Sequence, residues 1–474
     1  MAEHRTAFVL AGGGTKGAFE VGAVTYLVRE LALVPDILTS ASAGSLIASV
    51  LAQARAPDEF RRRADEVRQD LLAMTDLDVV FGRQPWVRDL HGTPIGDAID
   101  DMIELRPPLP ELPDDPTHSD PTHPGPTAPT AAPGRDRTHH RRLSLHALRQ
   151  AVSSLPALLH VRKDFPGHES SVLTLDPLGD RLRGIDPTVA PTFAALDSSL
   201  VARPGLELRM AVTALRSGHT RYVTQAGVIV ESDAVTPSPE HPAPVELIEG
   251  VLTSASAPLI FPSRRLGDQD YSDGGIGQNL PVAAAVSLGA TRIYAVLAAA
   301  LEQPPDPRDF SKATFLDLDL RATMIMFADL QKANLEVARP PGVELTVIGP
   351  TVELVGTFEV NAGLMHIDLD YGHLRAQEVT AGLDPATLAR AQALTDRLIV
   401  ARDRAWFAEE AIWRDHASSA PDLAAIRALK AVVWTALADR VALGLAAPDG
   451  ADAWSTAWEV HADARPAVLP ADLS

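Results

Sequence analysis

The chain has 474 residues, and 46% of them are hydrophobic, which is enough for a large buried core divided over two to three structural units. Its 62 acidic and 42 basic residues give a net charge of −20, which argues against nucleic acid as a partner and against purely electrostatic binding to anionic membranes. It contains no cysteine, so disulfides and thiol catalysis are excluded.

The first predicted elements are a strand over residues 6–10, a glycine-rich turn and a helix with apolar residues at helical spacing. Glycines in such a turn permit positive φ angles and leave backbone N–H groups unshielded at the start of the helix. These groups stabilise an anion or a developing oxyanion. The turn reads Gly12-Gly13-Gly14-Thr15-Lys16-Gly17.

Two other interpretations of this turn fit less well than an oxyanion hole. Gly12, Gly14 and Gly17 match the spacing of a dinucleotide-binding loop, and Asp36 follows about 20 residues later, where a ribose-binding acid is expected. However, Asp36 opens the second predicted strand, whereas a ribose ligand belongs at a strand's carboxyl end. A nucleoside triphosphate loop is disfavoured because Lys16 precedes Gly17 and no Gly-Lys-Ser/Thr sequence follows.

The second predicted strand runs into a sharp turn of small residues, and an apolar helix over residues 46–51 follows. A strand, a tight turn and a helix in this order are typical of a nucleophile elbow, which lifts a central serine above the sheet. Here the central residue is Ser42. Gly44 matches the elbow pattern Gly-x-Ser-x-Gly, but Ser40 stands where the pattern has its first glycine. Turns of this kind also occur in α/β proteins without a catalytic role.

The composition changes sharply after the elbow region. Residues 107–142 are rich in Pro, Thr, Asp and His and lack apolar periodicity, which predicts a disordered insertion. Residues 143–204 regain helical patterning and are expected to form a helical cap region. The remaining units are the two parts of a catalytic domain at 1–106 and 205–350, and a mostly helical C-terminal extension at 351–474, with helices over 385–415 and 422–443.

A third motif, Asp273-Gly274-Gly275, is predicted at a turn. Asp-Gly pairs are common in turns that have no function beyond reversing the chain. Here the glycine-rich turn, the elbow and this aspartate occur together and in this order. The combination is therefore much more specific than any one of its parts.

Histidines offer an alternative base for the serine. A Ser-His-Asp triad could draw on His219, His366 or His373. His219 lies in a Ser-Gly-His turn, while His366 and His373 flank a predicted strand or loop, where a satisfied polar histidine is the commoner outcome. The histidines of the proline-rich segment, His118, His123, His139 and His140, lack metal-ligand spacing, so no metal site is expected, and no other cofactor is expected either.

The N-terminal residues and the lengths of the apolar segments predict where in the cell the protein is found. The first predicted strand begins at Thr6, which leaves no room for a secretory signal, and no run of 18 apolar residues exists. We therefore expect a cytoplasmic protein without a transmembrane segment. Any transient contact with a membrane surface would be peripheral, local and apolar.

On these motifs the chain resembles the patatin-like phospholipase family. The resemblance rests on the Gly12–Gly17 loop, on Ser42 with Gly44, and on Asp273-Gly274-Gly275, and it covers about residues 6–54 and 205–350. Two positions depart from the family pattern, because Ser40 replaces a glycine and Lys16 stands where arginine is frequent. The resemblance implies a three-layer α/β/α fold with a largely parallel central sheet and a Ser-Asp dyad, to which this chain adds its helical C-terminal extension.

The resemblance further implies a lipid acyl hydrolase acting on phospholipids, lysophospholipids or neutral acylglycerols. Ser42 would attack the ester carbonyl, Asp273 would accept its proton without a histidine, and the amides of the Gly12–Gly14 loop would form the oxyanion hole. Lys16 would orient this loop or a substrate phosphate, or would simply be solvated. The alternative that Ser40 leaves open is a catalytically weak or inactive patatin-fold protein that binds lipid or a protein partner.

Overall fold

The computed structural model of the chain describes residues 4–74, 77–90, 171–185, 195–241, 243–302, 315–337, 339–415 and 420–461, with short pieces between 92 and 116 and at 310–311. The expected insertion at 107–142 lies almost wholly outside these residues, as do positions 143–170 and 186–194 of the expected cap region. The start of the insertion differs from the expectation, because Leu112 packs against the main core and the carbonyl of Pro113 accepts a hydrogen bond from Arg397.

Within the described residues, nine strands form one mixed sheet. Its parallel part has the order β11 (Glu344–Ile348), β10 (Arg292–Val296), β1 (Thr6–Leu10), β2 (Ile37–Ser40) and β5 (Glu207–Ala214). The antiparallel part joins β5 to β6 (Thr220–Thr224), β7 (Ile229–Val230), β9 (Gln269–Asp273) and β8 (Arg264–Leu266). A separate pair joins β3 (Gly82–Arg83) to β4 (Leu173–Thr174).

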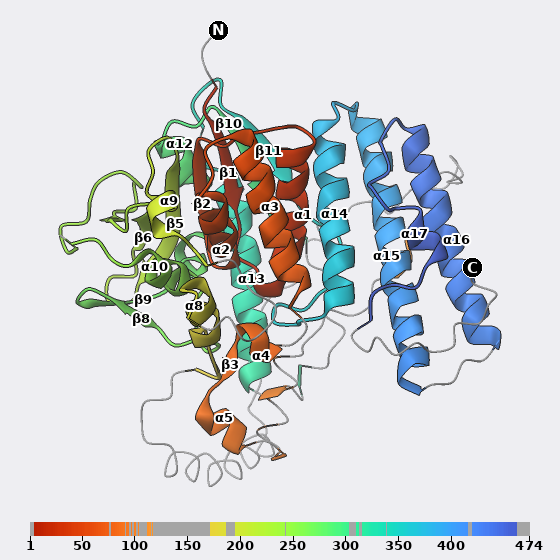
Figure 1. The fold of residues 1–474 in the computed structure, drawn as a ribbon, viewed down its shortest axis with the longest axis horizontal. Coiled ribbons are helices and arrows are strands. Elements are labelled where there is room, and N and C mark those ends of the chain that lie inside the picture. The colour runs from red at the N-terminus through yellow and green to blue at the C-terminus, as the bar shows by residue number, and fades with distance from the viewer. Residues whose placement is uncertain are drawn as a thin grey trace, which may run out of the picture.

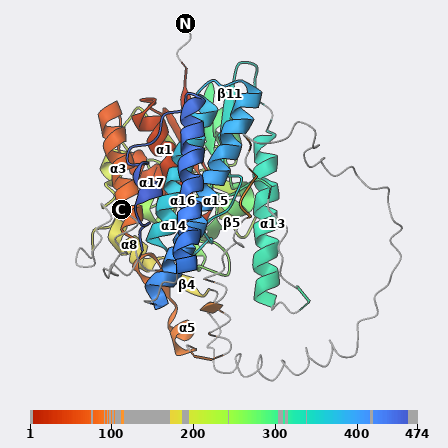
Figure 2. The same ribbon diagram turned by 90° about the vertical axis from the view of Figure 1, so that its right-hand side faces the viewer.

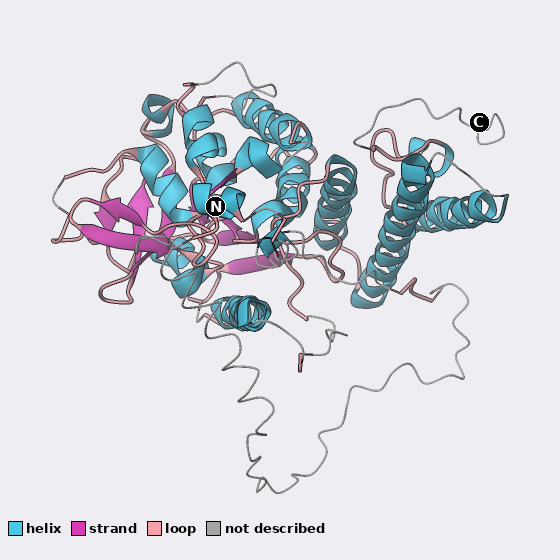
Figure 3. Cartoon of the chain, turned by 90° about the horizontal axis from the view of Figure 1, so that it is seen from below, coloured by secondary structure: helices cyan, strands magenta, loops and turns pink. Residues whose placement is uncertain are grey.

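Alternate residues of β1 face two different cores, as the two-residue period of a strand requires. Phe8 and Leu10 belong to the larger core, whereas Ala7 and Val9 belong to a second core on the opposite face, and all four are fully buried. A strand covered on both faces has a continuous apolar sequence, which is why β1 is recognisable. Figure 3 shows helices on both sides of the sheet. The expected three-layer α/β/α architecture is therefore confirmed.

The helices divide between these two layers and the periphery. One layer contains α1 (Gly17–Arg29), α2 (Ala43–Leu51), α3 (Pro57–Leu72), α10 (Leu247–Ser254) and α14 (Ala362–Thr380). The other contains α11 (Gly275–Gln278), α12 (Val282–Ser287) and α13 (Phe315–Leu335), and Figure 2 shows α13 on the far side of the molecule from α3. Shorter peripheral helices are α4 (Leu77–Val80), α5 (Pro85–Asp89), α8 (Asp176–Leu182) and α9 (Ser198–Val201).

Helix α14 packs directly on α1, the helix that follows the glycine-rich turn. A Cβ atom at Gly22 would lie 1.9 Å from the carbonyl oxygen of Leu369, and one at Gly372 would lie 1.9 Å from that of Phe19, so only glycine allows the two backbones to touch. Asp368 on α14 accepts a hydrogen bond from the N–H of Phe19 at 3.2 Å, which satisfies a donor at the start of α1.

The position of α14 corrects the expectation for His366 and His373. Both lie within this helix and not beside a strand or loop. Nearly every face of α14 is buried, including the sides that carry Asp368 and Arg375, so its sequence has no apolar stripe that would mark it as a helix.

The C-terminal part continues with α15 (Pro385–Asp415), α16 (Ala420–Ala442) and α17 (Ala453–Thr456), close to the predicted helix bounds. Figure 1 shows α14, α15 and α16 side by side. Buried ion pairs link them, since Glu378 on α14 pairs with Arg375 at 2.9 Å and with Arg440 on α16, and Arg375 also pairs with Asp396 on α15. In the described parts of the chain, no helix is long and apolar enough to cross a bilayer.

Candidate active site

Ser42 and Asp273 lie next to each other at one edge of β5, at the point where the pairing of β5 with β2 stops and its pairing with β9 starts. Residues 207–210 of β5 pair with β2, and residues 212–214 pair with β9, while β6 occupies the opposite edge. Ser42 follows the end of β2, and Asp273 is the last residue of β9. The sheet therefore brings the two residues together from opposite directions beside Ala211, the one β5 residue between the two pairings.

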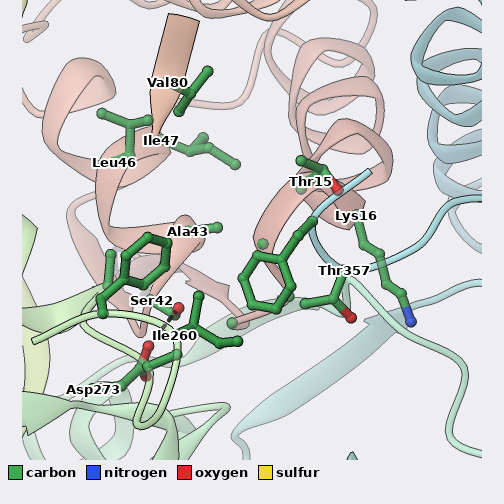
Figure 4. A pocket seen from close by; sticks show the side chains of 18 of the residues that line it. Thr15, Lys16, Ser42, Ala43, Leu46, Ile47, Val80, Ile260, Asp273 and Thr357 are labelled. Atoms are coloured by element: carbon green, nitrogen blue, oxygen red, sulfur yellow. Dashed lines mark hydrogen bonds between the residues drawn. The ribbon is translucent and has the colours of Figure 1, made fainter. Parts of the chain in front are cut away.

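Ser42 lies at a strained position immediately before α2. Its φ of 50° and ψ of −128° place it in a region that L residues rarely adopt, at a free-energy cost of about 1–3 kcal/mol. The turn is tight enough that a Cβ at Gly44 would lie 2.5 Å from the carbonyl oxygen of Ala11. The Ser42 hydroxyl donates a hydrogen bond to Asp273 Oδ2 at 2.7 Å (Figure 4). Strain at such a turn is typical of a nucleophile elbow.

Asp273 is a buried carboxyl group with few polar partners. Its side chain is 1% exposed, and its Oδ1 accepts a hydrogen bond from the N–H of Gly275 at 2.6 Å. Burial raises the pKa of Asp273 to about 7, although the hydrogen bonds from Ser42 and Gly275 act in the opposite direction. A carboxylate with a pKa near neutrality is a far better proton acceptor than a solvated one.

The glycine-rich turn lies on the other side of Ser42, but its three amides are not equivalent. The N–H of Gly12 donates to the carbonyl and Oδ1 of Asn279 at 3.2 and 3.1 Å, so the structure differs from the expectation that this amide belongs to an oxyanion hole. The N–H groups of Gly13 and Gly14 have no acceptor among the described residues. These two amides therefore remain open to a ligand oxygen.

Residues 353–358, far along the chain, hold the turn in place. The N–H of Thr15 donates to the carbonyl of Thr357 at 2.9 Å, and a Cβ at Gly14, whose φ is +62°, would lie 2.1 Å from the same oxygen. Lys16 Nζ forms a 2.7 Å ion pair with Glu353, and the Lys16 side chain extends away from Ser42 (Figure 4). Both side chains of the pair are at most 10% exposed, so the interpretation of Lys16 as solvated is wrong.

Two further acidic residues are buried under the turn. Glu20 on α1 accepts a hydrogen bond from the N–H of Ala11 at 2.6 Å, and burial raises its pKa well above the usual value. Burial likewise raises the pKa of Asp368 to about 8. Burial thus favours the protonated form of both carboxyl groups, and Asp368, with its pKa of about 8, is largely protonated at neutral pH. Both side chains accept backbone hydrogen bonds around the turn.

Ser40 fits its position without displacing the elbow. It is fully buried at the end of β2, and its hydroxyl lies 3.0 Å from that of Ser45. The serine at position 40 is thus accommodated by a polar partner five residues further along, Ser45 in α2. It gives no steric reason for the turn to be inactive.

The remaining supporting glycines have steric roles. A Cβ at Gly274 would lie 2.2 Å from the carbonyl oxygen of Ala211, which requires glycine after Asp273. A Cβ at Gly275 would lie 2.9 Å from Asp273 Oδ1. Gly17 begins α1, where a Cβ would make only ordinary contacts. Gly274 therefore lets the Asp273 turn approach β5 closely, and Gly275 leaves room for the Asp273 carboxyl group.

An apolar cavity of about 170 Å³ opens beside Ser42 and the glycine-rich turn. Phe81, Phe261 and Phe358 pack together on its wall, with ring centroids 5.1 to 6.4 Å apart. Such a wall suits a hydrocarbon chain and offers few partners to a polar ligand. Further lining residues are Leu46, Ile47 and Val50 of α2, Val67 and Leu71 of α3, Leu178 of α8 and Phe327 of α13.

The other candidates from the sequence lie elsewhere. His219 is exposed in the turn between β5 and β6, and His373 packs edge-on against Tyr26 of α1 with ring centroids 4.9 Å apart. Asp36 lies before β2, at the amino end of the strand, where its carboxylate accepts a hydrogen bond from the N–H of Thr6 at 2.8 Å. This position does not suit a ribose-binding acid, as the sequence indicated.

Sequence reasoning missed three residues at the site, namely Asn279, Ser254 and Glu353. Asn279 holds Gly12 from both sides, because its Nδ2 also donates to the Gly12 carbonyl at 3.3 Å. Ser254 accepts a hydrogen bond from the N–H of Ser42 at 3.1 Å. The only signal in the sequence for these two residues was proximity to Asp273: Ser254 begins a small-residue segment before it, and Asn279 follows it by six positions. Glu353 had no signal, because it contacts the turn from more than 300 residues away.

Comparison with known proteins places these features in a family. A family model described as patatin-like phospholipase matches residues 8–286, more than half of the chain. Among solved structures, VipD from Legionella pneumophila is 14% identical with a TM-score of 0.31, and the match covers 96% of this chain and 83% of VipD. The type III effector ExoU, from Pseudomonas aeruginosa, is 14% identical with a TM-score of 0.24, covering 96% of this chain and 71% of ExoU. Comparison with curated proteins gave no match.

Proposed function

The chain belongs to the patatin-like phospholipase family, and we propose that it is a serine hydrolase that cleaves acyl ester bonds of lipids through Ser42 and Asp273. The observation that carries the proposal is the 2.7 Å hydrogen bond from the Ser42 hydroxyl to the buried carboxyl of Asp273, beside an apolar cavity. A nucleophile, its base and a site for hydrocarbon thus adjoin one another, which is the minimum that ester hydrolysis of a lipid requires.

In the first step, Ser42 Oγ forms a bond to the acyl carbon while its proton passes to Asp273 Oδ2. The carbonyl oxygen gains negative charge, which the open N–H groups of Gly13 and Gly14 stabilise. The tetrahedral intermediate then collapses, the bond to the alcohol oxygen breaks, and Asp273 returns the proton to the leaving alcohol. Gly12 acts indirectly in this account, since its N–H is bound to Asn279 and fixes the loop.

In the second step, water attacks the acyl-enzyme ester, and Asp273 accepts a proton from that water. The acyl carbon is released as a fatty acid, and the proton returns to Ser42 Oγ. The elevated pKa of Asp273 makes both proton transfers feasible near neutral pH, because its protonated and ionised forms are about equally populated there. No histidine is needed in either step.

We propose a phospholipid, a lysophospholipid or a neutral acylglycerol as the substrate class, with the acyl chain in the cavity. The test is release of free fatty acid from phosphatidylcholine, lysophosphatidylcholine and triacylglycerol in mixed micelles, with wild type and Ser42→Ala compared. Wild type is expected to hydrolyse at least one of these lipids, and Ser42→Ala none. Equal rates for the two proteins, or no turnover by wild type of any lipid, would contradict the proposal.

A further inference from the structure

Ala211 of β5 pairs with neither β2 nor β9, and the side chain of Ser254 takes the place of a strand partner there. Along β5, Ala211 lies between the end of β2 and the end of β9, and its carbonyl accepts a hydrogen bond from Ser254 Oγ at 2.7 Å. Ser254 is the last residue of α10 and is fully buried. Its oxygen also accepts the N–H of Ser42 at 3.1 Å. One hydroxyl therefore ties the elbow to the strand beside which both candidate residues lie.

The same hydroxyl ends a chain of three buried serines whose hydrogen bonds can have only one direction. Ser254 donates its proton to Ala211, so in the 2.8 Å contact between Ser45 and Ser254 the proton comes from Ser45. Ser45 has then no proton left, and in its 3.0 Å contact with Ser40 the donor is Ser40. The serine that replaces glycine at position 40 thus supplies the first proton of an ordered chain that leads under the elbow.

Ser254 also contacts the other half of the candidate dyad through its backbone. Its carbonyl accepts the N–H of Gly274 at 3.2 Å, directly after Asp273. The neighbouring Ser256 carbonyl accepts the N–H of Asp273 itself at 3.0 Å. A single short segment therefore holds the nucleophile through a side chain and the base through main-chain bonds.

We propose that Ser254 is a positioning residue, which holds Ser42 in its strained conformation and fixes its distance from Asp273. Without an acceptor for its N–H, Ser42 can relax away from a φ of 50°, and its hydroxyl moves relative to Asp273. A displacement of about 1 Å in such a pair lowers a reaction rate by roughly 100-fold. This inference rests on the proposed function, because its effect is seen in the rate of that reaction.

The test compares kcat and KM of wild type, Ser254→Ala and Ser45→Ala on the lipid ester that wild type hydrolyses. Ser254→Ala is expected to lower kcat about 10- to 100-fold with KM within about twofold, since the cavity wall is unchanged. Ser45→Ala is expected to lower kcat less, because Ser254 still accepts the N–H of Ser42. The control is Ser49→Ala on α2, a fully buried serine whose hydroxyl bonds to the Leu46 carbonyl at 2.8 Å.

Thermal unfolding separates positioning from a general loss of stability. Ser49→Ala and Ser254→Ala each lose one buried hydroxyl, and only Ser254→Ala is expected to show the about 10- to 100-fold fall in kcat. A folded Ser254→Ala with wild-type kcat, or an equal fall in kcat for Ser49→Ala, would overturn the inference while leaving the proposed function intact. If Ser254→Ala does not fold, Ser254→Cys, a weaker acceptor of similar size, is expected to lower kcat at least about fivefold, and wild-type kcat there overturns the inference. Inactive wild type overturns the proposed function and this inference together.

Discussion

Replacing Asp273 with asparagine should abolish turnover and yet stabilise the folded protein at alkaline pH. The folded pKa of Asp273 is about 7, whereas an aspartate in an unfolded chain has a pKa of about 3.9. Because the raised pKa means that the folded state binds more protons than the unfolded state, stability falls as pH rises through this window. Asparagine does not ionise, so the variant does not lose this stability as the pH rises. Its Oδ1 can still accept a hydrogen bond from the N–H of Gly275.

The magnitude follows from the two pKa values. Each pH unit between 5.5 and 7 removes about 1.4 kcal/mol from wild type, and the loss levels off above pH 7. Between pH 5.5 and pH 8 the Asp273 carboxyl therefore lowers the free energy of unfolding by about 2 kcal/mol. Glu20 and Asp368 also make the free energy of unfolding depend on pH, but they do so in both proteins and cancel in the comparison.

The assay is urea unfolding of wild type and Asp273→Asn at pH 5.5 and pH 8. The stability of the variant relative to wild type is expected to increase by about 2 kcal/mol from the lower to the higher pH. Asp270→Asn, at an exposed position of the same strand, is the control and should show no such change. A relative stability of Asp273→Asn that is the same at both pH values would show that the Asp273 carboxyl has an ordinary pKa and would contradict the prediction.

Four other predictions concern the pH profile, the Lys16–Glu353 ion pair, Ser40 and the proline-rich segment. The kcat/KM of wild type should rise tenfold per pH unit below pH 7 and level off above it; a flat profile from pH 5 to 8 would exclude Asp273 as the base. Lys16→Met should lower the free energy of unfolding by about 3–5 kcal/mol by leaving Glu353 buried without its partner, and Lys16→Met/Glu353→Gln should recover most of this; an unchanged single variant would contradict the pairing. Ser40→Gly should keep activity within about tenfold, or about 1.4 kcal/mol in barrier, whereas Ser40→Leu should abolish it; an inactive wild type that Ser40→Gly activates strongly would favour a binding protein. Deletion of residues 118–137, which spares Leu112 and Pro113, should change the melting temperature little, and a loss of many degrees would show that this segment is packed.

The parts of the fold that the sequence predicts are those with local signals. The buried strand over residues 6–10, the small-residue elbow around Ser42 and the Asp273 turn each carry a pattern set by neighbours in the chain. Helix α15 occupies the residues predicted for it. In these places local propensity and the final fold agree.

The parts that could not be predicted depend on contacts between distant segments. The occupation of the Gly12 amide by Asn279, the ion pair of Lys16 with Glu353 and the hydroxyl of Ser254 under the elbow each join segments more than 200 residues apart. The helix α14 was missed for a different reason, because burial on nearly all sides removes the periodicity that marks a helix. The residue types at the site were therefore predictable, but the contacts that hold them were not.

Covalent labelling shows directly whether Ser42 is the nucleophile. Folded wild type is incubated with a fluorophosphonate, which reacts with activated serine hydroxyls, and the modified peptide is identified by mass spectrometry. We expect one labelled residue, Ser42, with no labelling of Ser42→Ala. Asp273→Asn should be labelled little, because its Ser42 hydroxyl lacks its base. Labelling of another serine in wild type, or persistence of the label in Ser42→Ala, would contradict the assignment of Ser42 as the nucleophile.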